Sequence, residues 1–99
     1  MNYSPSYIDK ENYYSVGVDS ETGNHMLEVV ITHIAWYSRY FALTEDEIRR
    51  FKSDPASLKP LALSLAGSGA IKVYASRLVY SEKTAENELR DSYLSNNSA

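Results

Sequence analysis

The chain of 99 residues contains no cysteine. Disulfide frameworks and thiolate metal sites are therefore excluded, and a small secreted scaffold built on disulfides is not expected. No apolar run approaches the roughly 18 residues that a membrane-spanning helix needs. The N-terminal stretch MNYSPSYIDKENYY has neither the basic start nor the apolar block of a signal peptide. We therefore expect a cytoplasmic protein that does not associate with membranes.

Basic residues are also scarce, with 10 Lys and Arg against 13 Asp and Glu and a formal net charge of −3. Affinity for nucleic acid comes largely from Lys and Arg that displace counterions, so we expect no nucleic-acid partner. The same charge is compatible with a basic protein partner. Tyrosine, by contrast, is abundant: nine residues, against one Trp and two Phe. Its apolar ring and polar tip suit half-buried positions and interface rims.

The length and the 43% hydrophobic content predict a single domain over residues 1–99. A chain of this size buries somewhat over about 60% of the surface that it exposes when unfolded, which is enough to fold without a metal or disulfides. Residues 1–12 are polar, contain Pro5 and show no sustained period, so we expect an irregular N-terminal arm. Residues 95–99 are expected to form a disordered tail.

Alternating apolar residues predict a strand over residues 13–19, with Tyr14, Val16 and Val18 on one face. The turn SETGN follows, with Gly23 in position for a positive φ. Residues 25–43 are rich in β-branched and aromatic residues, but nineteen residues would make an improbably long strand. We expect two strands, or one strand with a sharp bend near residues 33–38.

Thr44 begins a predicted helix, because TEDE fits a capping box in which Thr44 and Glu47 satisfy each other's amides. Asp54 and Pro55 suit a second helix start, with the regular helix expected from about Lys59 and a stop at Gly67. Residues 69–82 alternate and predict another strand, and residues 81–97 predict a terminal helix that frays after residue 94. The fold class is therefore α+β: a mainly antiparallel sheet of three to four strands with two to three helices packed on one face.

No catalytic, metal or cofactor motif stands out, so we expect neither an enzyme nor a bound cofactor. His25 and His33 lack neighbouring ligands for a metal, and AGSGA places its glycines after a helix, where a phosphate loop would have them before one. Acid–base catalysis by His33 with Glu28 or Tyr37 is left as an alternative, which a deep pocket with converging polar groups would favour.

Two stretches offer candidate contact surfaces. The outer face of the 69–82 strand would carry Lys72, Tyr74, Ser76, Leu78 and Tyr80. That pattern resembles a single-stranded nucleic-acid platform, but the RNA-recognition signature is absent, which leaves packing against the fold or a protein contact.

In WYSRYFALTEDEIRR, Phe41 and Leu43 are predicted to point inward, which leaves Trp36 and Tyr40 partly exposed. The three acids that follow suit the helix start and need no further role, although they would also suit a basic partner.

The passage WYSRYFALTEDEIRRFKSDPASLKPLA, residues 36–62, leads from a strand into two helix starts. With the small size, the acidity, the lack of cysteine and the α+β order, it resembles the small cytosolic immunity proteins of bacterial contact-dependent inhibition and other polymorphic toxin systems. This resemblance implies a stoichiometric inhibitor that binds a toxin domain, often a nuclease, and covers its active site or an exposed surface.

We therefore expect a non-catalytic inhibitor that binds a basic toxin domain directly. The alternative is a small structural or regulatory module that forms a homodimer through an open sheet edge; the inhibitor itself could be a monomer or a homodimer. Acidic residues would steer the partner and aromatic residues would anchor it. The candidate partner-binding residues are Asp19, Glu21, Glu28, Trp36, Tyr40, Glu45, Asp46, Glu47, Tyr74 and Tyr80.

Overall fold

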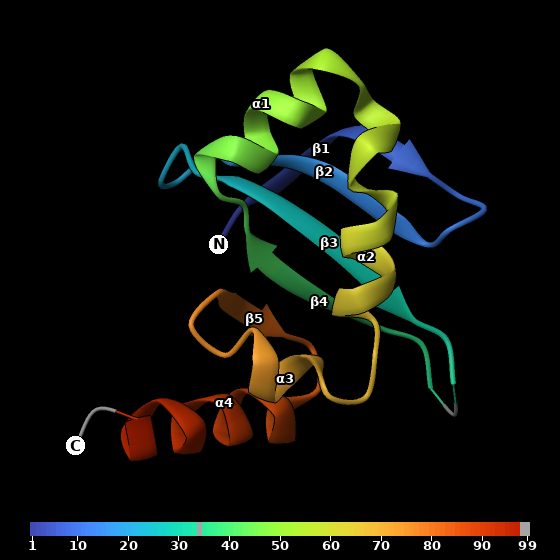
Figure 1. The fold of residues 1–99 in the computed structure, drawn as a ribbon. Coiled ribbons are helices and arrows are strands. Elements are labelled where there is room, and N and C mark those ends of the chain that lie inside the picture. The colour runs from blue at the N-terminus through green and yellow to red at the C-terminus, as the bar shows by residue number, and fades with distance from the viewer. Residues whose placement is uncertain (34, 98–99) are drawn as a thin grey trace.

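The computed structural model describes residues 1–33 and 35–97, which form a five-stranded sheet with helices across one face and beside one edge (Figure 1). Each strand pairs antiparallel with the next, in the order β1-β2-β3-β4-β5. The α+β class and the antiparallel sheet agree with the sequence prediction, but the strands number five and not three to four. The strands are β1 (Tyr3–Asp9), β2 (Tyr14–Asp19), β3 (His25–Ile31), β4 (Tyr37–Ala42) and β5 (Leu78–Ser81).

The helices lie between β4 and β5 and after β5. They are α1 (Glu45–Ser53), the 3₁₀ helix η1 (Pro55–Leu58), α2 (Lys59–Leu65), α3 (Ala70–Val73) and α4 (Thr84–Asn97). In Figure 1, α1 and α2 cross one face of the sheet, while α3 and α4 lie beside β5. Among the described residues there are four α-helices, where the sequence predicted two to three.

The predicted helix starts are confirmed. The Thr44 hydroxyl accepts a hydrogen bond from the Glu47 amide at 3.2 Å, and the Glu47 carboxylate accepts one from the Thr44 amide at 2.9 Å. Asp54 accepts from the Ala56 amide at the start of η1, and the regular helix begins at Lys59. Both starts could be predicted because a cap is a local interaction among a few consecutive residues.

The N-terminal segment is not the irregular arm that its sequence suggested. Residues 3–9 form β1, which pairs with β2 from Tyr3 opposite Asp19 to Asp9 opposite Tyr14. A bulge between Pro5 and Tyr7 shifts the register and breaks the alternation that would mark a strand. Pro5 is tolerated because β1 is an edge strand, where a missing N–H costs no ladder hydrogen bond.

The segment 69–82 is also corrected: α3 occupies its first part and only Leu78–Ser81 is a strand. Within α3, Ala70 and Ile71 are buried whereas Lys72 and Val73 are exposed, so the apolar residues of this segment do not share one strand face. Lys72, Tyr74 and Ser76 therefore do not share a strand face with Tyr80.

Residues 25–43 form two strands, as one of the two predicted arrangements required. Strand β3 ends at Ile31 and β4 begins at Tyr37, so the break between the two strands overlaps the region predicted for it, residues 33–38. At the other end of the chain, α4 continues through Asn97, so residues 95–97 are helical and do not belong to a tail. The rest of the predicted tail, residues 98 and 99, lies outside the described residues.

The core lies between the sheet and the helices. Val16, Leu27 and Phe41 are directly paired neighbours on three strands, and each is fully buried. Leu58 and Leu65 from η1 and α2 are buried in the same cluster. Full burial of such a side chain stabilises a fold by about 1.5–3 kcal/mol. The inward position predicted for Phe41 is confirmed, and Leu43 packs partly buried against this core.

The opposite face of the sheet, called the open face below, is not covered by α1 or α2 (Figure 1). It is curled: the Tyr3 ring on β1 contacts the Tyr40 ring on β4 across two intervening strands, with centroids 5.4 Å apart. The curl depends on Gly17, because a Cβ atom there would lie 2.2 Å from the Ser4 carbonyl oxygen. From the strand register, the open face carries Ser15, Gly17, Met26, Glu28, Val30, Ser38, Tyr40, Ala42 and Tyr80.

Candidate functional site

Glu28 lies at the centre of the open face, and among the described residues only hydroxyl groups hold its carboxylate. One carboxylate oxygen accepts from the Ser15 hydroxyl at 2.9 Å; the other accepts from Ser38 at 2.6 Å and from the Tyr40 phenol at 3.2 Å. The side chain is half-buried. Among the described residues, no Lys, Arg or His forms an ion pair with it. Since buried carboxylates are normally paired with cations, this charge has unused binding capacity.

Three tyrosine rings form a row over Glu28. The Tyr40 ring contacts Tyr3 at 5.4 Å and Tyr80 at 6.3 Å, and the Tyr3 phenol shares a 2.8 Å hydrogen bond with Ser15. Burial raises the pKa of Tyr3 to about 12. Burial, followed by the charge of Glu28, raises the pKa of Tyr40 to about 12 as well. Both phenols therefore remain protonated at neutral pH.

A hollow of about 250 Å³ adjoins Glu28 on the open face. Pro5, Ile8 and Val30 contribute apolar walls, and Lys10, in the turn after β1, lines it too. Tyr13 also lines it and contacts the ring of Trp36, with centroids 5.6 Å apart.

The aromatic pair of Tyr13 and Trp36 is exposed. Trp36 is 67% exposed and Tyr13 is 45% exposed. Tyr13 adopts a φ of 56°, a left-handed conformation that is uncommon for a bulky residue, in the turn between β1 and β2. The exposure predicted for Trp36 and, in part, for Tyr40 is confirmed.

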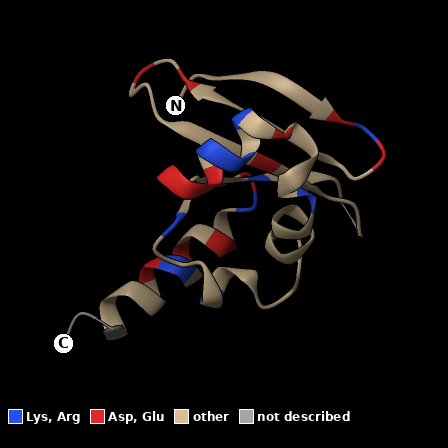
Figure 2. Cartoon of the chain, turned by 45° about the horizontal axis from the view of Figure 1, so that its top comes forward, with Lys and Arg blue, Asp and Glu red and all other residues tan. Residues whose placement is uncertain are grey.

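The open face lacks basic side chains from the strands. Arg39 is the only Lys or Arg within the five strands, and its register places it on the helix-covered face with Val29 and Tyr14. Figure 2 shows most Lys and Arg residues on helices and loops. The fixed charge of the strands on the open face is therefore negative.

Arg39 pairs with Glu86 of α4 on the helix-covered side, where both residues are buried. The guanidinium donates to both Glu86 oxygens, at 2.9 and 2.7 Å, and its remaining nitrogen donates to the carbonyls of Leu65 and Gly67. Tyr37 and Ser81 also donate to Glu86, each at 2.8 Å. Burial alone would raise the pKa of Glu86, but these hydrogen bonds outweigh it and hold the pKa below its ordinary value.

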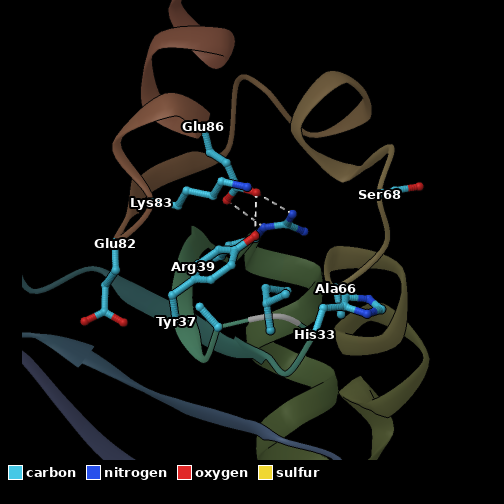
Figure 3. Close-up of a pocket in the computed structure, with 10 residues that line it drawn as sticks. His33, Tyr37, Arg39, Ala66, Ser68, Glu82, Lys83 and Glu86 are labelled. Carbon is cyan, nitrogen blue, oxygen red and sulfur yellow. Dashed lines mark hydrogen bonds and ion pairs between the residues drawn. The ribbon is translucent and has the colours of Figure 1, made fainter.

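A pocket of about 660 Å³ lies beside this ion pair (Figure 3). Its lining comes from β3, β4 and the loop between them, from the connection after α2 and from the turn before α4. His33 lines the pocket, whereas Glu28 is on the open face, so the fold does not bring this possible acid–base pair together. Tyr37 donates its hydroxyl to Glu86, and among residues 1–33 and 35–97 no hydrogen bond links His33 to another side chain.

The acids predicted at the start of α1 differ in how they are used. Asp46 pairs with Arg49 and Arg50 along the helix. Glu47 is buried, completes the capping box and pairs with Arg77. Within the described chain only Glu45 of the three has no ion pair or capping hydrogen bond. This group therefore presents less free charge than the sequence suggests.

Three further candidates hold the fold together. Asp19 is buried and accepts from the amides of Asn2 and Glu21, and these backbone hydrogen bonds lower its pKa. Glu21 pairs with the N-terminal amine at 2.9 Å. Tyr74 packs edge-on against Phe41 at 6.3 Å, on the core side. Of the predicted set, the structure brings together Glu28, Tyr40 and Tyr80.

The sequence did not reveal Tyr3, Tyr13, Lys83 or the Arg39–Glu86 pair as parts of these sites. The sequence predicts an irregular arm over residues 1–12, which includes Tyr3. Arg39 did leave a signal, because it alternates with Phe41 and must therefore point inward, where a charge requires a partner. Nothing in the sequence singles out Glu86, which lies 47 residues away from Arg39.

The described residues contain no group of three or more His, Asp or Glu side chains that could hold a metal ion. In the same part of the chain, none of the helices has the length and apolarity needed to cross a membrane. Comparison with protein-family models, with curated proteins and with solved structures found no match to this chain.

Proposed function

We propose that the chain is a non-catalytic inhibitor that binds a basic protein through the open face, as an immunity protein binds its cognate toxin. The observation that carries the proposal is Glu28, a half-buried carboxylate that hydroxyls support and that no cation of the described chain pairs with. A Lys or Arg side chain from a partner would supply the missing charge in the adjoining hollow of about 250 Å³.

The rings around Glu28 support the same role. Tyr and Trp supply much of the binding energy at protein interfaces, because they bury a large area at low entropic cost. Tyr80 and Trp36 are 45% and 67% exposed; Tyr80 belongs to the tyrosine row, and Trp36 contacts Tyr13, which lines the hollow. A cation on Glu28 would also lie near Tyr40, whose phenol hydrogen-bonds the carboxylate.

The homodimer alternative is disfavoured by the sheet edges. Strand β1 presents Pro5 and a bulge at one edge. At the other edge, the Asn87 side chain hydrogen-bonds both the amide and the carbonyl of Ser81, and Arg90 donates to the carbonyls of Leu78 and Val79. Both edges are thus protected against pairing with a second sheet.

Co-expression with a neighbouring toxic open reading frame tests the proposal. The chain should restore growth, and the purified pair should form a complex with one copy of each protein. Glu28→Gln should weaken that complex by at least about tenfold, because it leaves the partner's cation buried without a counter-charge. Tyr80→Ala should weaken it by a similar factor if the row anchors the partner.

Glu88→Gln is the matched control, since it removes the same charge from an exposed position on α4. It should leave growth rescue and affinity unchanged. Equal affinity of Glu28→Gln and wild type would exclude the open face as the binding surface. A stable dimer of the isolated chain in sedimentation, with no toxin rescued, would favour the structural module.

A further inference from the structure

The pocket beside the Arg39–Glu86 pair has no role in the proposed function. Its volume of about 660 Å³ falls within the range of roughly 300–1,000 Å³ typical of small-molecule sites. It lies on the helix-covered side of the sheet, away from Glu28. Both charged residues at its base are buried, with Arg39 at 4% and Glu86 at 8% exposed. The base of the pocket is therefore fixed before any ligand enters.

Two cations, Arg39 and Lys83, and two carboxylates, Glu82 and Glu86, line this pocket, but only Arg39 and Glu86 form an ion pair among the described residues. Arg39 and Glu86 neutralise each other, and every oxygen of Glu86 already accepts two hydrogen bonds. Lys83 lies over the Tyr37 ring at 5.8 Å and has no carboxylate partner among the described residues. In Figure 3 the Lys83 side chain runs toward the ion pair, whereas the Glu82 carboxylate turns away from it. Glu82 is instead engaged with the Ser38 amide, at 2.6 Å.

The remaining walls are apolar or aromatic. Ile31, Ala35 and Ala66 line the pocket together with Tyr37. Arg39 also lies near that ring, with its central carbon 6.0 Å from the centroid. A flat apolar ligand would pack against the Tyr37 ring, and a negative group on that ligand would approach the Lys83 ammonium. His33 adds an imidazole to the lining, and within residues 1–33 and 35–97 it forms no hydrogen bond to another side chain.

From this geometry we infer that the pocket binds a small aromatic organic anion, such as a carboxylate or sulfonate on a planar ring. Tyr37 provides the stacking surface and Lys83 the counter-charge. Arg39 and Glu86 are positioning residues, because they hold Tyr37 in place and neutralise each other. The inference stands apart from the proposed function, since the two sites lie on opposite faces of the sheet.

Anilinonaphthalene sulfonate is a suitable probe, because it joins an anion to aromatic rings and its fluorescence reports an apolar site. The folded wild-type chain should bind one molecule, and amide NMR shifts should cluster around Tyr37, Ala66 and Lys83. Lys83→Gln should weaken binding at least about tenfold, the size expected for loss of a charged hydrogen bond. Phenylnaphthylamine, a neutral analogue of similar shape, should bind more weakly than the sulfonate.

Lys72→Gln is the matched control, because Lys72 is exposed on α3 and does not line the pocket. It should bind the probe as wild type does, as should Glu28→Gln on the open face. Thermal unfolding of each variant would show that the fold is intact. The inference would be overturned if Lys83→Gln bound the probe as tightly as wild type does. It would also be overturned if the neutral analogue bound more tightly than the sulfonate, or if the NMR shifts clustered on the open face.

Discussion

The two faces of the sheet each hold a glutamate in a dense hydrogen-bond network, and the two networks differ in one respect. Glu86 receives an arginine, a phenol and a serine hydroxyl, so its charge is neutralised within the chain. Glu28 accepts hydrogen bonds from two serine hydroxyls and a phenol, and no cation from the part of the chain that the structure describes pairs with it. The described chain thus neutralises the charge of Glu86 internally and leaves the charge of Glu28 without a counter-charge.

This difference separates a structural site from the proposed binding site. An internal ion pair fixes how two elements meet, here β4 and α4, but offers nothing to a partner. A carboxylate held only by neutral donors keeps its geometry and its charge together. Such preorganisation lowers the cost of binding a cation, because the side chains are already ordered. The comparison predicts that a charge-removing substitution lowers the stability of the fold on the helix-covered face, whereas on the open face it weakens binding and leaves stability nearly unchanged.

The largest effect is expected from Arg39→Met, which leaves Glu86 buried without a counter-charge. Removal of one partner of a buried ion pair typically costs about 3–5 kcal/mol, which approaches the whole stability of many domains of this size. Urea denaturation followed by circular dichroism would measure it. The double variant Arg39→Met with Glu86→Leu should recover a large part of the loss, because no unpaired charge remains. A double variant as unstable as Arg39→Met would show that shape, and not charge, is what matters there.

Gly17→Ala should have the next largest effect, on the open face this time. The added methyl group would lie 2.2 Å from the Ser4 carbonyl oxygen and 2.6 Å from the Pro5 Cα, so β1 must move. Overpacking against backbone costs about 1–3 kcal/mol. Gly23→Ala is not a matched control, because Gly23 has a φ of 76°. Gly69→Ala is a better one, since a methyl group there would meet nothing within 4 Å, and its denaturation midpoint should stay close to that of wild type.

Local features of this fold could be predicted from the sequence, and distant pairings could not. The capping box of Thr44 and Glu47 involves residues three apart, and the inward position of Phe41 follows from alternation. Strand β1 was missed because its bulge at Pro5 breaks the period. Helix α3 was missed because four residues are too few to separate a helical period from alternation.

The candidate sites were predicted only in part, for the same reason. Tyr40 and Glu28 were both named, but their contact spans 12 residues and depends on the register of β3 against β4. Trp36 was placed correctly as exposed, since it lies at the strand break. The partner of Arg39 lies in a helix whose docking is decided by tertiary packing. Sequence patterns carry no information on which distant helix that is.

The acid dependence of stability should reflect Glu86. Its pKa in the folded chain lies below the ordinary Glu value of about 4.3, so the unfolded chain binds the proton more readily. The stabilisation is therefore complete above that ordinary value and is lost as the pH falls through the folded pKa. Glu86→Gln should show a shallower loss of stability below about pH 4.3 than wild type, when both are followed by urea denaturation. Parallel acid curves would mean that other carboxylates, such as Asp19, set the dependence.

The smallest effect on stability is expected from Glu28→Gln, which replaces the charge with a neutral group of the same shape. The hydroxyls of Ser15, Ser38 and Tyr40 can each accept as well as donate, so they can rotate to suit the amide. The change in unfolding free energy should stay within about 1 kcal/mol, the net worth of a single hydrogen bond. Binding of the basic partner, however, should fall by at least about tenfold. If the variant instead unfolds as readily as Arg39→Met, the charge of Glu28 serves the fold, and the two faces do not differ in kind.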